Sequence, residues 1–146
     1  MSQRPVVPSA LEKEHEEIHQ QLVAATQAPG KTGEAAKALA AVLHPHFERE
    51  QQIALPPLGA LAKMASGQPD PSRKEAIRLS RILAREMPKM LREHKAIASA
   101  AKRLEATAVA EGRHEAAELA RKLMLHAKTE EQVTYPAAIL VGKYGK

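Results

Sequence analysis

Apolar residues recur at alternating spacings of three and four along four stretches of this chain, the pattern of amphipathic helices with one buried face. Turn-forming residues separate the stretches, which run over about residues 10–26, 32–54, 73–110 and 114–141. The short connections after the first and third stretches predict antiparallel hairpins. We therefore expect an all-α fold, an up-down-up-down four-helix bundle built from two repeated helical hairpins. Its predicted parts are an N-terminal arm (1–9), the bundle (10–142) and a C-terminal tail (143–146).

The predicted buried stripes contain polar residues as well as apolar ones. Their members are Leu11, His15, Ile18, Leu22 and Ala25; Leu39, Leu43, His46, Glu50 and Ile53; Leu83, Met87, Met90, His94, Ile97, Ala101 and Leu104; and Leu119, Leu123, His126, Glu130, Val133, Ala137 and Leu140. An ionised carboxylate in a bundle core is very unfavourable unless a partner compensates its charge. No Lys or Arg falls on these stripes, so a bound cation is the simplest compensation.

The two hairpins carry the same motifs in the same order. Glu14-His15-x-x-Ile18 recurs as Glu93-His94-x-x-Ile97, and His46-x3-Glu50 before Leu55-Pro56 recurs as His126-x3-Glu130 before Tyr135-Pro136. His15 and His46 lie equally far from the first turn, so an antiparallel hairpin places them at the same height. Each glutamate follows its histidine by one helical turn on the same face. The sequence therefore predicts two half-sites, each with two histidines and one glutamate, that face each other in a dinuclear centre. Imidazole with carboxylate suits iron, manganese or zinc.

The composition narrows the classes of function. The 146 residues include no cysteine, which excludes disulfides and thiolate chemistry. The net charge of +5 is spread along the chain among glutamates, and the aromatic residues are one phenylalanine and two tyrosines. We therefore expect no surface for stacking bases and no nucleic-acid partner. No apolar stretch is long enough to cross a bilayer and the N-terminus lacks a secretory signal, so we expect no membrane association and a cytoplasmic protein.

The order His…His-x3-Glu…His…His-x3-Glu, with Glu-Glu-x3-Tyr-Pro at residues 130–136, resembles the hemerythrin-like (HHE cation-binding) family over about residues 10–142. The resemblance implies two non-haem iron ions, bridged by two carboxylates and an oxo or hydroxo group. It also implies a small-molecule ligand (dioxygen, nitric oxide or peroxide) or a role in sensing or storing iron, served by an unknown redox partner protein. A metal-binding protein is expected rather than a dedicated enzyme, and no catalytic residue is assigned. The matching ligand positions are His15, His46, Glu50, His94, His126 and Glu130.

Hemerythrins usually have a fifth histidine ligand, and the resemblance makes His19, one turn after His15, the candidate. Our hypothesis is that His15, His19 and His46 hold one iron. His94 and His126 then hold the other, which keeps an open position for a small molecule. The two glutamates bridge the pair.

Tyr135 and three rival interpretations stay open at this point. Tyr135 is either a hydrogen-bonding neighbour of the ligands or a packed core aromatic. His15-Glu16-x-x-His19 matches the H-E-x-x-H helix of zinc metallopeptidases, with Glu16 as general base, although no substrate-binding strand is predicted. A ferritin-like bundle needs Glu-x-x-His on two helices, whereas both clear copies here fall on the first. A metal-free helical interaction module would fold normally after chelation.

Overall fold

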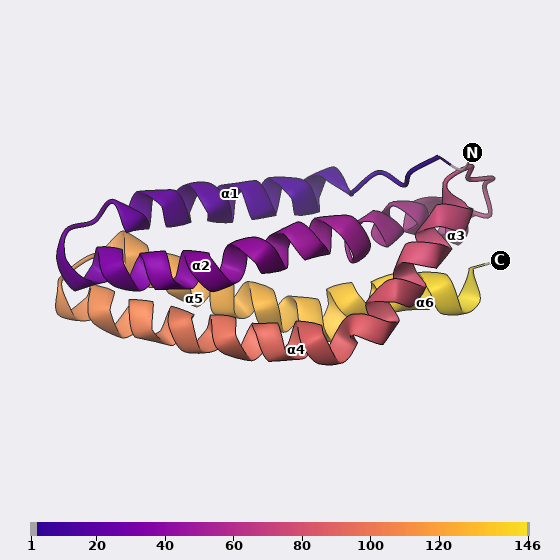
Figure 1. The fold of residues 1–146 in the computed structure, drawn as a ribbon. Helices are drawn as coiled ribbons and strands as arrows, with labels where there is room; N and C mark the ends of the chain where they lie inside the picture. Colours follow the sequence, from indigo (N-terminus) through magenta and orange to yellow (C-terminus); the bar gives the residue numbers. More distant parts are fainter. Residues whose placement is uncertain (1–2, 146) are drawn as a thin grey trace.

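In the computed structural model, which describes residues 3–145, the chain forms four helical rods that lie side by side (Figure 1). The rods are α1 (Ser9–Thr26), α2 (Gly30–Ile53), α4 (Arg73–Ala110) and a composite of α5 (His114–Thr129), the π-helix η2 (Glu130–Thr134) and α6 (Tyr135–Tyr144). The 3₁₀ helix η1 (Pro56–Ala60) and the short helix α3 (Leu61–Ser66) connect α2 to α4. No strand occurs within residues 3–145, and the predicted all-α four-helix bundle is confirmed.

The ends and the inner prolines leave this architecture intact. Residues 3–8 of the predicted arm are not helical, and α6 extends to Tyr144 within the predicted tail. Residues 1–2 of the arm and residue 146 of the tail lie outside the described residues. Pro45 and Pro88 lie inside α2 and α4 without ending them, and α4 is bent (Figure 1), as a helix with an inner proline often is.

The turns of the two hairpins meet at one end of the bundle and bind each other. The Glu111 carboxylate, just after α4, accepts hydrogen bonds from the backbone N–H groups of Lys31 at 3.2 Å and Thr32 at 2.7 Å, and from the Thr32 hydroxyl. These donors are the first groups of α2, where a negative charge is favourable. Gly30 has a φ of 76°, and a Cβ there would lie 2.7 Å from Glu111 Oε2. Glycine therefore allows this close approach.

The apolar core has two main layers and a smaller third cluster that includes Val141. The layer nearer the hairpin turns is built from α1, α2, α4 and α5, and includes Ile18, Leu39, Leu43, Ile97 and Leu123. The other layer includes Ile53, Leu55, Leu83, Met90 and Tyr135. The buried histidines and glutamates lie between the two layers along the rods. The fold thus holds a polar layer between two apolar ones.

The predicted stripe of the last rod is wrong beyond Glu130. Val133 and Leu140 were expected in the core but are 61% and 48% exposed. In the π-helix η2, the Tyr135 N–H bonds to the Glu130 carbonyl five residues back, which adds one residue to the turn. Every later side chain is therefore rotated by one position. The residues buried in place of the predicted ones are Tyr135, Ala138 and Val141.

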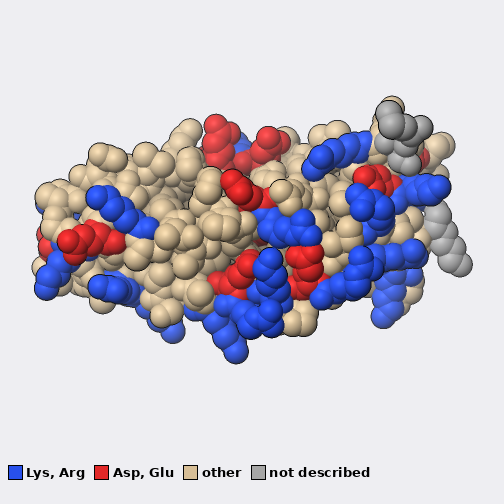
Figure 2. Space-filling model, viewed as in Figure 1, with Lys and Arg blue, Asp and Glu red and all other residues tan. Residues whose placement is uncertain are grey.

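The surface carries basic and acidic side chains together. On the face shown in Figure 2, Lys and Arg lie among Asp and Glu over much of the molecule. Ion pairs such as Arg121–Glu105 at 2.6 Å join side chains of opposite charge. None of the helices in the described part of the chain is both long and apolar enough to span a bilayer.

Candidate metal centre

Six side chains converge in the polar layer, and all six are buried. They are His15 of α1, His46 and Glu50 of α2, His94 of α4, His126 of α5 and Glu130 at the start of η2. Their nitrogen and oxygen atoms form two groups, each with four donors within 4.8 Å of one another. The His15/His126 group and the His46/His94 group both include Glu50 and Glu130. The arrangement is that of two adjacent cation sites that share two carboxylates.

The structure pairs the histidines across the hairpins, not within them. We expected His15 beside His46 at one metal, and His94 beside His126 at the other. Instead the rings of His15 and His126 are 5.0 Å apart, and those of His46 and His94 are 4.8 Å apart. The expected partition is wrong because spacing from a turn gives the height of a histidine along its helix. It does not give the neighbouring helix toward which the side chain points.

His19 belongs to neither group. It is exposed, and its ring lies 6.2 Å from that of the exposed His44, beside a cavity of about 240 Å³ between α1 and α2. Four residues along a helix rotate a side chain by about 40° and shift it by about 6 Å. That displacement takes His19 out of the layer that contains His15. The geometry therefore supports neither the fifth-histidine hypothesis nor the joint zinc site of the H-E-x-x-H interpretation.

Carboxylates bind the outer nitrogens of three of the four clustered histidines. The pairs are His46 Nδ1–Glu93 Oε1 at 2.7 Å, His94 Nδ1–Glu131 Oε1 at 3.0 Å and His126 Nδ1–Glu14 Oε1. An ionised carboxylate can only accept a hydrogen bond, so each Nδ1 carries the proton. Each Nε2 then presents its lone pair to the interior, which is the tautomer that a metal ligand needs.

Glu14 and Glu93 stand in the repeated Glu-His motif, yet their role was missed. Glu14 precedes His15 in the sequence but contacts His126, the other histidine of the same group. Glu93 has the equivalent position in the second hairpin and serves the other group in the same way. Their recurrence at equivalent positions of the two hairpins could have marked both residues as candidates. Spacing alone does not identify a partner on another helix, which is why these contacts were not predicted.

His15 has different surroundings from the other three histidines. Its Nδ1 is 3.5 Å from Gln51 Nε2, and in the internal repeat Gln51 corresponds to Glu131. The ring of Phe47 stacks on that of His15 at 4.0 Å, with 9° between the planes. An amide and an aromatic ring thus replace the carboxylate contact, and the two groups are not equivalent.

The His15/His126 group fits a cation. Within the described residues, four of its buried atoms have no hydrogen-bond partner: His15 Nε2, His126 Nε2, Glu50 Oε1 and Glu130 Oε2. His15 Nε2 is 3.6 Å from Glu50 Oε1 and 3.5 Å from Glu130 Oε2, and His126 Nε2 is 3.1 Å from Glu130 Oε2 without hydrogen-bond geometry. Adjacent donors on an octahedral ion with bonds of about 2.1 Å are about 3.0 Å apart. Buried polar atoms without partners are unfavourable, and a cation between them would satisfy all four.

The two buried carboxylates shift each other's ionisation. Burial and the charge of Glu130 raise the pKa of Glu50 well above its usual value. Burial would also raise the pKa of Glu130, but its close contacts with Glu50 and with three of the clustered histidines hold it well below its usual value. Without a cation, one proton is thus favoured on the pair, whereas a divalent cation would stabilise both as carboxylates.

The histidines respond to the same environment. Burial lowers the pKa of His46 despite its contact with Glu93. Burial also opposes charge on His94 and His126, but the negative charge and close contact of the Glu130 carboxylate outweigh it and raise both pKa values. Positive charge is therefore favoured beside Glu130, which is where a cation would lie.

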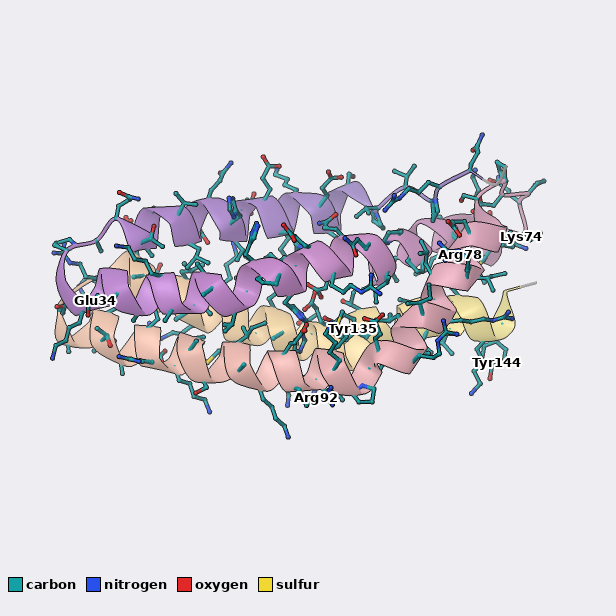
Figure 3. The ribbon with its side chains drawn as sticks, viewed as in Figure 1. Glu34, Lys74, Arg78, Arg92, Tyr135 and Tyr144 are labelled. Atoms are coloured by element: carbon teal, nitrogen blue, oxygen red, sulfur yellow. The ribbon has the colours of Figure 1, made fainter. Side chains whose placement is uncertain are left out.

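Tyr135 is both a packed core aromatic and a hydrogen-bonding neighbour of the clustered residues, the two roles that the sequence left open. Its ring packs in the second apolar layer and is completely buried, while its hydroxyl enters the polar layer (Figure 3). The hydroxyl is 3.1 Å from His46 Nε2, 3.1 Å from His94 Nε2 and donates to Glu50 Oε2. Burial and the charge of Glu50 raise the pKa of this phenol. Tyr135 is thus in contact with the cluster and not only a packing residue.

A helical bundle with a buried layer of four histidines and two shared carboxylates is a cation-binding bundle by its chemistry. The family described as Hemerythrin HHE cation binding domain matches residues 6–138, and the chain belongs to this family. The resemblance seen in the sequence is confirmed, and the family and the cluster together indicate metal binding. No curated protein and no solved structure matches the chain.

Proposed function

We propose that this protein binds two non-haem iron ions in its histidine and glutamate cluster and presents them to a small molecule. The candidates for that molecule are dioxygen, nitric oxide and peroxide, and sensing or storing iron would use the same cluster. The observation that carries the proposal is the pair of four-donor groups that share Glu50 and Glu130. Iron is favoured because imidazole and carboxylate together suit it, as in the family that the sequence resembles.

The residues around the cluster support this function. Glu50 and Glu130 would bridge the two ions, and the clustered histidines would bind through Nε2 while outer carboxylates hold the rings of three of them in place. Bound iron would supply a redox-active Lewis acid. Burial of all six side chains keeps bulk water away, so a small neutral molecule is a better occupant than a large polar one. We assign no catalytic residue, and the cytoplasmic location and the redox partner stay predictions.

Elemental analysis of the untagged protein, with an optical spectrum in air, tests the proposal. We expect about two irons per chain, and ferric charge-transfer bands in the near ultraviolet. Glu50→Gln should lose iron, whereas Glu48→Gln, an exposed position on the same helix, should retain it. One zinc and no iron, or no metal after anaerobic ferrous reconstitution, would refute the di-iron proposal.

His19→Ala separates this function from the metallopeptidase alternative. Because His19 is exposed and lies outside both donor groups, we expect the iron content and optical spectrum to be unchanged. His15→Ala is the matched substitution inside the cluster and should reduce the iron content. If His19→Ala also lost metal, the fifth-histidine hypothesis would return.

A further inference from the structure

We propose that Tyr135 is a direct protein ligand of the metal in the His46/His94 group, so that the two metals are inequivalent. The inference rests on the proposed function, because it needs a metal in that group. It goes further by adding a phenolate oxygen to a ligand set of imidazoles and carboxylates, and by assigning it to one metal only.

The first argument is the geometry of three donor atoms. Tyr135 Oη is 3.1 Å from His46 Nε2 and 3.1 Å from His94 Nε2, and these two nitrogens are 3.1 Å from each other. This nearly equilateral triangle matches one face of an octahedron, whose adjacent donors are about 3.0 Å apart when the bonds are about 2.1 Å. The phenol oxygen therefore lies where a third ligand would lie.

The second argument is that hydrogen bonding among these atoms cannot satisfy all of their lone pairs. His46 and His94 have their Nδ1 protons directed to carboxylates, so both Nε2 atoms are acceptors. The one hydrogen of the Tyr135 hydroxyl is used in its contact with Glu50 Oε2. Even with a proton on Glu50 that is donated to the hydroxyl oxygen, the single phenol hydrogen could satisfy only one of the two nitrogens. At least one buried lone pair then lacks a donor, which is unfavourable unless a cation lies between the three atoms.

The third argument comes from the internal repeat. Leu55 corresponds to Tyr135, and both residues follow the shared glutamates by five positions. The Leu55 N–H bonds to the Glu50 carbonyl at 2.9 Å, as the Tyr135 N–H bonds to that of Glu130. Leu55 is buried in the same apolar layer without any polar atom in its side chain. The fold therefore does not need a hydroxyl at this position, and the hydroxyl of Tyr135 requires another explanation.

Binding would break the phenol O–H bond, form an oxygen–metal bond and release the proton to solvent. Tyr135 then adds a fifth protein donor to the His46/His94 group, while the His15/His126 group keeps four. The small molecule should therefore bind at the His15/His126 metal. This assignment replaces our first hypothesis, which left the open position on a metal held by His94 and His126.

Resonance Raman and visible absorption spectra of the iron-loaded protein test the ligand. We expect a phenolate-to-iron charge-transfer band in the visible range, with tyrosinate vibrations enhanced on excitation in that band. Both should be lost in Tyr135→Phe and kept in Tyr144→Phe, which changes the other tyrosine of the chain at an exposed position. The wild-type spectrum decides the question even if Tyr135→Phe does not fold.

The outcomes separate this inference from the proposed function. Iron-loaded wild type without tyrosinate vibrations, or with a spectrum that Tyr135→Phe leaves unchanged, would overturn the ligand role alone. A wild-type protein that binds no iron would overturn both. Azide is the probe for the open position: it should add its own band while the tyrosinate band persists. Loss of the tyrosinate band on azide binding would mean that azide binds the His46/His94 metal and displaces Tyr135, which would contradict the assignment of the open position to the other metal.

Discussion

At the scale of single residues, the outer carboxylates decide how well the histidines are prepared for a metal. Glu93 holds the ring of His46 through Nδ1 at 2.7 Å, so Glu93→Ala removes the acceptor that fixes this ring and its tautomer. We expect the metal affinity to fall by about 10- to 100-fold, measured by competition with a chromophoric chelator. Glu16→Ala, which changes an exposed glutamate of α1, is the control and should have wild-type affinity. Equal affinities for the two variants would contradict a positioning role of Glu93.

The sequence allowed us to predict which residues lie in the cluster, but not which of them contact each other. His46 and Glu50 were predictable because a core stripe in water-soluble helices excludes such groups unless something binds them. The pairing across hairpins was not predictable, since periodicity describes one helix at a time. The choice of His19 as a ligand stays a prediction that the geometry does not support: a histidine one turn from a buried one fits the family pattern, but rotation on the helix leaves it exposed.

At the scale of helices, the π-turn after Glu130 determines which residues of the last rod are buried. Val133 and Val141 form a matched pair, because the same substitution can be made at an exposed and at a buried site. Val141→Ala should lower the free energy of unfolding by about 2 kcal/mol through lost apolar contact and a small cavity. Val133→Ala should change it by less than about 0.5 kcal/mol. Denaturant unfolding of both variants checks this, and a larger loss at Val133 would restore the register predicted from the sequence.

The helices themselves were predictable because their stripes are long and their turns contain glycine and proline. The π-turn was not, since Val133 and Leu140 continue the same apolar period as the residues before Glu130. The internal repeat contained one indication of an irregular turn at this point. Pro56 and Pro136 both follow an apolar or aromatic residue five positions after a shared glutamate, and a proline cannot donate the regular helical hydrogen bond.

The contact between the hairpin turns predicts a pH-dependent stability. Hydrogen bonds from the Thr32 hydroxyl and backbone, and from the Lys31 backbone, lower the pKa of Glu111. Because the folded-state pKa is lowered, the stabilisation is present above the unfolded-state pKa and is lost as pH falls through the folded-state value. Glu111→Gln should therefore lower the melting temperature at neutral pH, but not in acid below the lowered folded-state pKa of Glu111, where the wild-type carboxyl is protonated too. Glu118→Gln, at an exposed position beyond the first turn of α5, is the control. A difference that persists unchanged in acid would contradict the capping role of the charge.

At the scale of the whole molecule, the polar layer interrupts what would otherwise be one continuous core. Burial raises the pKa of Glu50, and four atoms of the layer lack partners among the described residues, so the metal-free fold carries an unfavourable centre between two well-packed layers. The layer that enables binding is then also the least stable part of the bundle. A bound cation would join the four rods at this layer.

Metal removal should therefore lower stability, and one substitution should abolish that effect. A cation that binds only the folded chain adds about 2.7 kcal/mol at a free concentration 100 times its Kd, and each kcal/mol moves the melting temperature of a chain of this size by about 2–4 °C. Calorimetry with iron and then with excess chelator should show a loss of that order in the wild type. Glu50→Leu removes a buried carboxylate that binds the metal, so the chelator should not change the melting temperature of this variant. That temperature should exceed the melting temperature of the metal-free wild type, because an apolar side chain replaces a buried carboxylate without a compensating charge. A wild-type protein that melts at the same temperature with and without chelator would mean that the cluster is satisfied without a metal, as expected of a metal-free interaction module.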